Sequence, residues 1–509
     1  MIPLEIASTN IKMPAQENTP AQSQAASSRE GAVQPNVPVP EQQAIVSQPQ
    51  TSVLTPTYQE ENAQPVAPQK PGRRVPKSIF LIIGFVLVFS MLAFLLIKLR
   101  PTIEGLLGQK GEIVWWGVTR DEGVMNSLIE AYQEENPGVE IKYIKQSSKD
   151  YRERLTNTLA RGEGPDIFQY HNSWVPMFKS ELDTLPESIM SQQEFASTFY
   201  PIITSDLTVD GEIVGMPLGF DALTLYVNED LFAAAVRIPP STWDEFRQTA
   251  LALTTKTERG VIIQSGAARG KTENIDHWPE ILALMMVQNR VNPANPSGQL
   301  AEDALEFYSV FAREDEICDE TLPPSTVAFA NGKVAMYFGP TWRANEINRL
   351  NSNLRFKTVP LPQLRKDDPG APDVSYSTYW VEGVWRRSAN GEVAWDFLKF
   401  LSEREQLEKL FERTSQIQLI GEPYPRVDMS DLLNEHPVIG SVIALAANAR
   451  SWYLASETFD GPTGINSQLE AIFKEAVDVA NSRSSPKRAL EPVPGEVAKV
   501  LSQYGIRVR

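Results

Sequence analysis

The residues of this chain best suited to chemistry are aromatic rings that fall at the ends of predicted strands or in loops. They are Trp116, Tyr170, Trp174, Trp342, Tyr379, Trp380, Trp452 and Tyr453. A ring face packs against the apolar C–H patches of a sugar, while nearby polar groups bond its hydroxyls. A single ring more often packs in a core, but together they favour a cleft walled by rings. His171 and Asn172 are candidate polar contacts, although a histidine in a loop more often contacts no ligand.

Covalent and metal chemistry have little support in the sequence. No phosphate-binding loop, nucleophile elbow, zinc-protease helix or dinucleotide fingerprint occurs where a strand, a turn and a helix would support it. The single cysteine, Cys318, excludes an internal disulfide and a multi-cysteine metal site, and three histidines leave little for a histidine-rich centre. A glycosidase-like carboxylate pair stays open, because the sequence gives no distances among 64 acidic residues. We expect no catalytic residue, no metal and no cofactor.

The composition indicates a large acidic protein with more than one domain. A length of 509 residues suggests two or three domains, and an apolar fraction of 42% is ample for a core. The chain has 47 Lys and Arg against 64 Asp and Glu, a net charge of −17. Because phosphate binding needs concentrated basic residues, this charge argues against a nucleic-acid partner.

The first 78 residues differ from the rest of the chain. They hold 12 of the 38 prolines and 11 glutamines, and Tyr58 is their one aromatic residue. Such a segment cannot bury enough apolar surface to offset its ordering entropy, so we predict a disordered cytoplasmic tail. A tether is the simpler interpretation of this tail, and a partner-binding segment is the alternative.

An uncharged run over residues 79–97 follows the tail. As a helix it would be about 28 Å long, close to the thickness of the hydrocarbon layer. A cleavable signal peptide would normally lie within about the first 30 residues, whereas 78 residues precede this run. We therefore predict an uncleaved transmembrane signal anchor, then a linker over 98–110. Flanking basic residues weakly favour a cytoplasmic N terminus, which places the large C-terminal domain outside the cell.

The elements after residue 110 alternate between strands and helices. Strands are predicted over 111–116, 139–144 and 166–170, with an amphipathic helix in each interval. This order implies a parallel sheet, and ligands bind outside the carboxyl ends of such strands. Two loops therefore become site candidates, 117–121, which includes Thr119, Arg120 and Asp121, and 171–174.

The pattern continues to the C terminus. A hairpin is predicted over 211–217, and strands are predicted over 223–227 and 333–338. Residues 239–246 read as a capped helix start with an acidic first turn. Helices dominate from 278 to about 317, and further helices are predicted over 392–410 and 466–482.

The order of these segments resembles the extracellular solute-binding proteins of ABC importers, in the sugar-binding family that includes maltose-binding protein. The motifs run from about residue 111 to the C terminus, and each is weak alone. They are Gly164-Pro165-Asp166-Ile167, Gly215-Met216-Pro217 with Leu225-Tyr226-Val227-Asn228-Glu229-Asp230-Leu231-Phe232, Pro240-Ser241-Thr242-Trp243-Asp244-Glu245-Phe246, Phe329-Ala330-Asn331-Gly332-Lys333-Val334-Ala335-Met336, Gly339 to Trp342, and Ala394-Trp395-Asp396-Phe397-Leu398-Lys399-Phe400-Leu401.

The resemblance implies an α/β periplasmic-binding-protein-like fold of two lobes that close on a ligand about a hinge. It implies a first lobe over about 111–219 and 373–425, and a second over about 222–371 and 426–509. Carried over by residue, Tyr170, Trp342 and the pair Trp452 and Tyr453 match aromatics of the sugar site, and Asp221 matches an acid after the hinge. Ser173 and Trp174 stand where the maltose-type site has an acid and an arginine, which leaves the sugar open.

We expect a membrane-anchored receptor that captures a carbohydrate, most simply an oligosaccharide, and delivers it to an ABC permease. Two alternatives remain at this point: a sensor or adhesion module of the same fold that is not coupled to transport, and a hydrolase on the same scaffold.

Overall fold

The structure is a computed structural model, and it describes residues 111–365 and 370–508. These residues all belong to one unit of the chain, Leu81–Arg509. The predicted tail, membrane span and linker, residues 1–110, lie outside the described residues. Within the described part of the chain, no helix is both long and apolar enough to cross a membrane.

The first lobe is built on a four-stranded sheet with the order β11-β3-β1-β2. Its strands are β1 (Gly111–Gly117), β2 (Val139–Lys145), β3 (Ile167–His171) and β11 (Trp380–Val384). β1 pairs in parallel with β2 and β3, which confirms the parallel sheet predicted from the alternating pattern. β11 arrives from far along the chain and pairs antiparallel with β3, so that Trp380 lies opposite His171.

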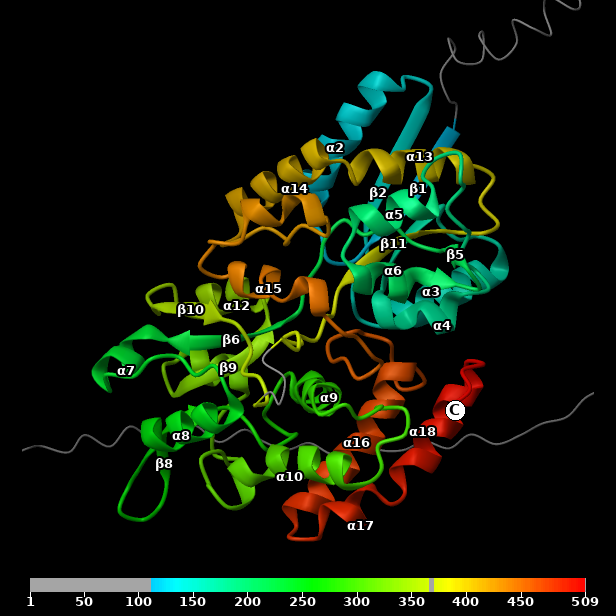
Figure 1. The fold of residues 1–509 in the computed structure, drawn as a ribbon. Helices are drawn as coiled ribbons and strands as arrows, with labels where there is room; N and C mark the ends of the chain where they lie inside the picture. The colour runs from blue at the N-terminus through cyan, green and yellow to red at the C-terminus, as the bar shows by residue number, and fades with distance from the viewer. Residues whose placement is uncertain (1–110, 366–369, 509) are drawn as a thin grey trace, which may run out of the picture. The chain divides into compact units, whose positions relative to one another are not determined.

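Helices cover both faces of this sheet (Figure 1). They are α2 (Glu122–Glu135), α3 (Tyr151–Arg161), α4 (Val175–Phe178), α5 (Gln192–Thr198), α6 (Pro201–Leu207), α13 (Gly391–Leu401) and α14 (Arg404–Ile417), with the short turn η1 (Asn172–Trp174). The short turn η2 (Val427–Leu432), which lies just past the last first-lobe segment, also contacts this lobe. α2, α13 and α14 pack together on one side, and η2 packs against α5. Trp115 of β1 lies edge-on to Tyr143 and Phe397, which joins the sheet to α13.

The second lobe is built on a five-stranded sheet with the order β10-β6-β9-β8-β7. Its strands are β6 (Leu223–Asn228), β7 (Thr255–Lys256), β8 (Ile262–Ala267), β9 (Val334–Pro340) and β10 (Phe356–Val359). β8 and β9 are parallel, and β6 runs antiparallel to both β9 and β10. The central strands β6 and β9 are buried along their whole length, as in a sheet covered on both faces.

The helices of the second lobe surround this sheet and extend below it in Figure 1. They are α7 (Glu229–Ala234), α8 (Trp243–Leu253), α9 (Trp278–Gln288), α10 (Gln299–Arg313), α11 (Ser325–Ala330), α12 (Arg343–Leu350), α15 (Gly440–Ile443), α16 (Ile465–Asn481), α17 (Pro486–Leu490) and α18 (Val493–Gln503), with the turn η3 (Ala446–Asn448). α8 begins with a capping box, in which Thr242 accepts from the Glu245 N–H and Glu245 accepts from the Thr242 N–H.

Two elements differ from the sequence prediction. The hairpin expected over 211–217 turns earlier and joins β4 (Thr208–Val209) to β5 (Glu212–Ile213), because Asp210 and Gly211 supply positive φ angles of 52° and 89°. The helix expected over 392–410 is interrupted between α13 and α14. There the Ser402 hydroxyl donates to the Lys399 carbonyl at 2.7 Å, which competes with continuation of the helix.

Candidate functional site

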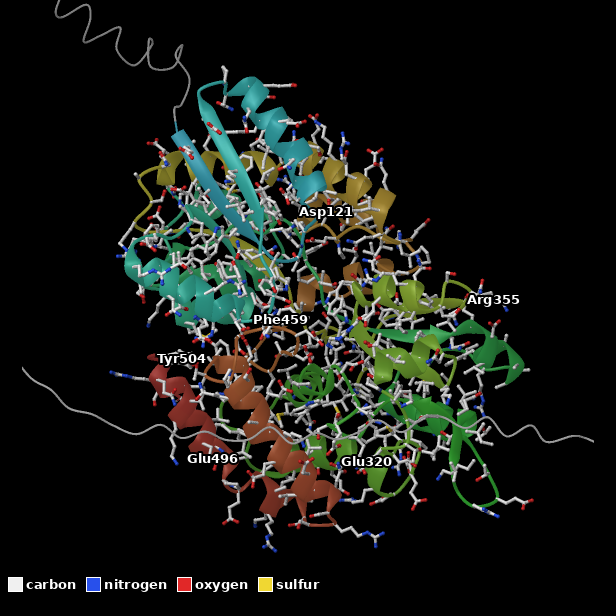
Figure 2. The ribbon with its side chains drawn as sticks, turned by 180° about the vertical axis from the view of Figure 1, so that it is seen from behind. Asp121, Glu320, Arg355, Phe459, Glu496 and Tyr504 are labelled. Atoms are coloured by element: carbon white, nitrogen blue, oxygen red, sulfur yellow. The ribbon has the colours of Figure 1, made fainter. Side chains whose placement is uncertain are left out.

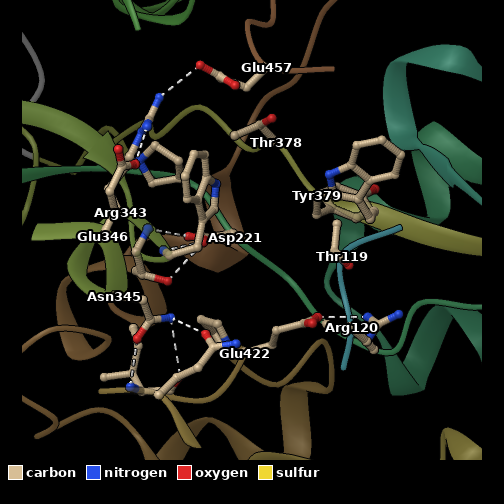
Figure 3. A pocket seen from close by; sticks show the side chains of 18 of the residues that line it. Thr119, Arg120, Asp221, Arg343, Asn345, Glu346, Thr378, Tyr379, Glu422 and Glu457 are labelled. Carbon is tan, nitrogen blue, oxygen red and sulfur yellow. Dashed lines mark hydrogen bonds and ion pairs between the residues drawn. The ribbon is translucent and has the colours of Figure 1, made fainter. Parts of the chain in front are cut away.

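A cavity of about 660 Å³ lies between the two lobes (Figure 3). The carboxyl ends of β1, β3 and β9 all meet it, as expected for ligand sites in open α/β sheets. Further parts of the wall come from residues 219–221 before β6, from the start of α9, from α12, from Thr378 and Tyr379 just before β11, and from residues within 418–423 and 456–459. Residues of both lobes therefore form the cavity.

Eight of the residues expected to contact a ligand line this cavity. They are Thr119, Arg120, Asp121, His171, Asp221, Trp342, Tyr379 and Trp380. The rings differ in how far they are available to a ligand. Trp342 is 39% exposed, whereas Tyr379 is buried and donates its hydroxyl to Asp206 at 2.8 Å.

The other six expected contacts lie elsewhere. Tyr170 and Trp174 are buried in the first lobe, where the Tyr170 hydroxyl donates to the Val214 carbonyl and Trp174 stacks on Tyr151 and Phe178. Trp116 is partly buried and packs against the core. A second cavity of about 350 Å³, also lined by both lobes, has Asn172, Trp452 and Tyr453 in its wall.

Arg120 is held from two sides and is not a free cation. It is buried and forms ion pairs with Glu382 of β11 and, at 2.7 Å, with Glu422. Burial disfavours its charge, but the two carboxylates raise the pKa of Arg120 above its ordinary value. Burial also raises the pKa of Glu382, although Arg120 and the Trp115 indole, which donates to it at 2.8 Å, favour its charged form. The guanidinium thus ties the loop after β1 to β11 and to residue 422.

The loop that carries Thr119 and Arg120 is fixed by one buried amide. The side-chain oxygen of Gln169 accepts from the Val118 N–H at 2.8 Å, from the Thr119 N–H at 2.9 Å and from the Thr119 hydroxyl at 3.1 Å. Its amide nitrogen donates to Glu382 at 3.1 Å. Because every polar atom of Gln169 is used, the loop is preorganised at the cavity wall. Asp121 ends this loop and caps α2 by accepting from the Gly123 N–H at 2.8 Å.

Asp221 links the hinge side of the cavity to the loop after β9. Its carboxylate accepts from the Thr341 N–H and hydroxyl, both at 2.9 Å, from the Trp342 N–H at 3.2 Å and from the Ala222 N–H at 2.7 Å. Burial nevertheless raises the pKa of Asp221 to about 7, because these bonds only partly replace lost hydration. Asp221 thereby sets the position of Trp342.

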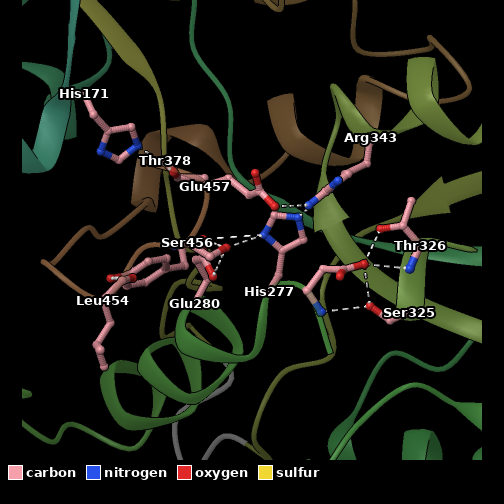
Figure 4. A network of polar contacts seen from close by, with 12 residues as sticks. His171, His277, Glu280, Ser325, Thr326, Arg343, Thr378, Leu454, Ser456 and Glu457 are labelled. Carbon is pink, nitrogen blue, oxygen red and sulfur yellow. Dashed lines mark hydrogen bonds and ion pairs between the residues drawn. The ribbon is translucent and has the colours of Figure 1, made fainter. Parts of the chain in front are cut away.

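A polar network in the second lobe supports the other face of the cavity (Figure 4). Arg343 lies 4.3 Å from the Trp342 ring centroid, donates to His277 Nε2 at 2.8 Å and pairs with Glu346 and Glu457. Because Nε2 accepts, the ring proton lies on Nδ1, which faces Ser456 at 3.0 Å.

Glu280 completes that network from within α9. It is fully buried and accepts from the Ser456 N–H at 2.7 Å and from the Ser456 hydroxyl at 2.8 Å. Burial raises its pKa, but the bonds from His277 and Ser456 outweigh this and hold the pKa of Glu280 below its ordinary value. The network therefore keeps a charged carboxylate in the cavity wall.

His171 meets the cavity as a neutral imidazole. Burial lowers its pKa to about 3, and the ring lies between the hydroxyls of Ser173 at 2.7 Å and Thr378 at 2.9 Å. Its edge contacts the Trp380 ring at a centroid distance of 5.5 Å. Both ring nitrogens are therefore engaged by these hydroxyls, and the ring carries no charge at neutral pH.

Several residues of the site are absent from the sequence prediction. Gln169 and Glu382 are polar residues inside buried strands, and that interruption of an apolar run is a signal that a sequence reading can detect. Arg343 directly follows Trp342, yet no feature of the neighbouring sequence predicts its contact with His277. Among the described residues, no group of three or more His, Cys, Asp or Glu side chains is arranged to hold a metal.

Comparison with known proteins identifies what this architecture is similar to. A family model described as bacterial extracellular solute-binding protein matches residues 127–419. A Brucella abortus protein described as a binding protein is 24% identical over 288 residues, which are 54% of this chain and 67% of that relative. These matches confirm the resemblance inferred from the motifs.

Solved structures show the same fold. The solute-binding protein of an ABC transporter from Thermotoga lettingae, bound with alpha-D-tagatose, matches with a TM-score of 0.59 and 20% identity, over 77% of this chain and 100% of that one. The sugar-binding protein of Xanthomonas citri matches with a TM-score of 0.60 and 18% identity, over 77% and 98%. The two-lobe α/β arrangement predicted from the sequence is thus confirmed.

Proposed function

Because the chain belongs to the family of bacterial extracellular solute-binding proteins, we propose that its interlobe cavity captures a carbohydrate for delivery to an ABC-type importer. The family is one of binding proteins rather than enzymes, so the ligand leaves chemically unchanged. The observation that carries the proposal is a cavity between two lobes in which the exposed Trp342 ring lies beside carboxylates, hydroxyls and a neutral imidazole. A sugar offers apolar C–H patches that pack on ring faces, and hydroxyls that bond such polar groups.

The ligand would act by bridging the lobes. The first lobe, over about 111–219 and 373–425, contributes Thr119, Asp121 and His171. The second, over about 222–371 and 426–509, contributes Trp342 and the network around Arg343. A ligand held by both lobes binds the closed state more tightly than the open one, and that difference in affinity drives closure about the hinge.

The proposed contacts divide into two groups. The eight residues that line the main cavity are the primary ones, and among them Trp342 offers the most accessible ring. Asn172, Trp452 and Tyr453 would contact a ligand that reaches the second cavity. Tyr170, Trp174 and Trp116 would support the site indirectly, by packing beneath the loops whose residues contact the ligand.

We also propose that residues 79–97 anchor the chain in the membrane, with the lobes outside and residues 1–78 in the cytoplasm. Nineteen uncharged residues between basic flanks support this arrangement. An anchored receptor would stay close to its permease, which raises the local concentration of captured ligand there.

A thermal-shift screen tests the central proposal. The full-length protein would be heated with monosaccharides, oligosaccharides, amino acids, peptides and polyamines. A ligand that binds only the folded state raises the melting temperature by mass action. We expect a saccharide to do so, and we expect Trp342→Ala to weaken its affinity about tenfold or more through loss of the ring face.

Leu350→Ala is the matched control, since Leu350 is 49% exposed on the same helix and does not line the cavity. It is expected to bind like the parent. A response to amino acids or peptides with none to saccharides would overturn the carbohydrate assignment. Equal binding by the Trp342 variant would remove the cavity as its site.

A further inference from the structure

Residues 454–464, a segment named here the strap, form part of the wall of the main cavity. Ser456, Glu457 and Phe459 of the strap all line the cavity. Figure 2 shows Phe459 at the level where the two lobes meet. The strap precedes α16 and contains no helix or strand, so side-chain contacts hold its backbone in place.

The strap is tied to both lobes. Glu457 pairs with Arg343 of the second lobe at 3.2 Å. Phe459 stacks on Trp380 of β11, with ring centroids 6.5 Å apart and planes at 26°. Arg152 of α3, in the first lobe, donates to the Asp460 carbonyl and, at 2.6 Å, to the Thr463 hydroxyl. The strap therefore spans the gap between the lobes at this end.

Its backbone is held in an unusual conformation. Glu457 and Phe459 both have φ of 57°, in the left-handed region that a bulky side chain seldom adopts. Such residues persist where surrounding contacts over-determine them, and they concentrate at ligand sites. Asp460 supplies one of those contacts, because its carboxylate accepts from the Asn466 N–H at 2.7 Å at the start of α16. These contacts hold the strap in a conformation that places Phe459 at the cavity.

Hydrogen bonds also join the two lobes on the other side of the cavity. Asn345 of α12 donates to Gln418 at 2.8 Å and accepts from the Ile420 N–H at 3.0 Å. These bonds join the second lobe to the segment that follows α14. Figure 3 shows Glu457 and Asn345 on opposite sides of the cavity. A cavity bounded by such contacts on two sides leaves less room for a long chain than an open groove does.

We propose that Phe459 is a specificity-determining residue that limits the length of the bound saccharide. This inference rests on the proposed function of the same cavity. The Phe459 ring stacks on Trp380 and so occupies a ring face on which a further sugar ring would otherwise stack. A short saccharide fits beside the strap, and a longer one must displace the strap and break its contacts with Arg343 and Arg152.

The test measures affinities of the full-length protein for gluco- and manno-oligosaccharides of one to six rings by calorimetry. The parent is expected to bind the short members and to lose affinity beyond the length that fits. Phe459→Ala is expected to raise the affinity for the longest members, relative to that for the short members, about tenfold or more. Phe459→Tyr, which keeps the ring, is expected to behave like the parent.

Arg152→Ala gives a second, independent variant, because it frees the strap without touching the cavity wall. It is expected to relax the length limit in the same direction. Saccharide binding by the parent with an unchanged length profile in both alanine variants would overturn the role of Phe459 and leave the proposed function intact. A parent that binds no saccharide at all would overturn the proposed function itself.

Discussion

Asp221 meets the cavity with a carboxylate that four donors of its own chain already occupy. Because a carboxylate has about four lone-pair sites, these donors already engage the group and hold it rigidly in place. Burial has a second effect, since it raises the pKa of Asp221 to about 7. A carboxyl whose pKa is higher in the folded than in the unfolded chain binds more protons when folded, between about pH 4 and pH 7.

This shift predicts a pH dependence of stability. The contribution of Asp221 favours folding most at low pH and is lost as the pH rises through about 7, the reverse of a carboxylate in an ion pair. Asp221→Asn cannot ionise, so we expect the parent to be more stable relative to this variant at pH 5 than at pH 8. Melting temperatures at the two pH values measure the difference. Asp303→Asn, an exposed change on α10, is the control. A difference that stays constant with pH would contradict the assignment.

The sequence predicts which residue types reach the site but not which way each one points. His171 meets the cavity while its neighbour Tyr170 points into the core, because successive strand residues face opposite sides of a sheet. Trp174 follows at the next turn and is buried too. Without the register of β3 against β11, no local rule decides between these outcomes. Glu382 could be recognised as unusual within its strand, but its pairing with Arg120 joins segments far apart in the chain.

At the scale of single elements, the helix α8 shows how local sequence fixes a boundary. Thr242 and Glu245 form a reciprocal cap, and Trp243 in the first turn packs against Phe246 and Phe338. The start of this helix was predictable because a cap and an acidic first turn are local features. The break between α13 and α14 was not, since it depends on a side-chain bond of Ser402, a residue type that also occurs within helices.

Removal of the cap hydroxyl has a definite expected cost. Thr242→Ala leaves the Glu245 N–H without its side-chain acceptor and is expected to destabilise the protein by about 1 kcal/mol. Urea unfolding measures this. Thr156→Ala is a suitable control, because the Thr156 hydroxyl bonds only the Arg152 carbonyl of its own helix and is exposed. A loss for Thr242→Ala no larger than the control would show that the box contributes nothing to stability.

At the scale of the whole molecule, the two-lobe arrangement follows from the order of elements and was predictable, while the walls of the cavity were not. Contacts such as Arg152 with Thr463, and Asn345 with Gln418, depend on how the lobes face each other. The hydrophobic periodicity of the elements within each lobe does not predict these contacts. The proposed anchor belongs to this scale too, and its support is the uncharged run at 79–97.

The anchor proposal predicts a sharp change in fractionation. We expect the full-length protein to stay with membranes through alkaline carbonate washing, with its C-terminal lobes accessible to protease from outside the cell. Val86→Lys with Phe89→Lys is expected to release it, because each charge near the bilayer centre costs about 2.5–3.5 kcal/mol. Val236→Lys, at an exposed loop position, is the control. Release of the parent by carbonate would refute a spanning helix.

The pairing of β11 with β3 also fixes an order of events during synthesis. The ribosome delivers β1, β2 and β3 early, but the strand that completes their sheet emerges only after β6 to β10 of the other lobe. A nascent chain that ends before residue 380 lacks both this edge strand and Glu382, the buried partner of Arg120. Each such chain carries an open sheet edge and an uncompensated arginine, so the sheet that is begun first cannot be completed until every strand of the other lobe has been made.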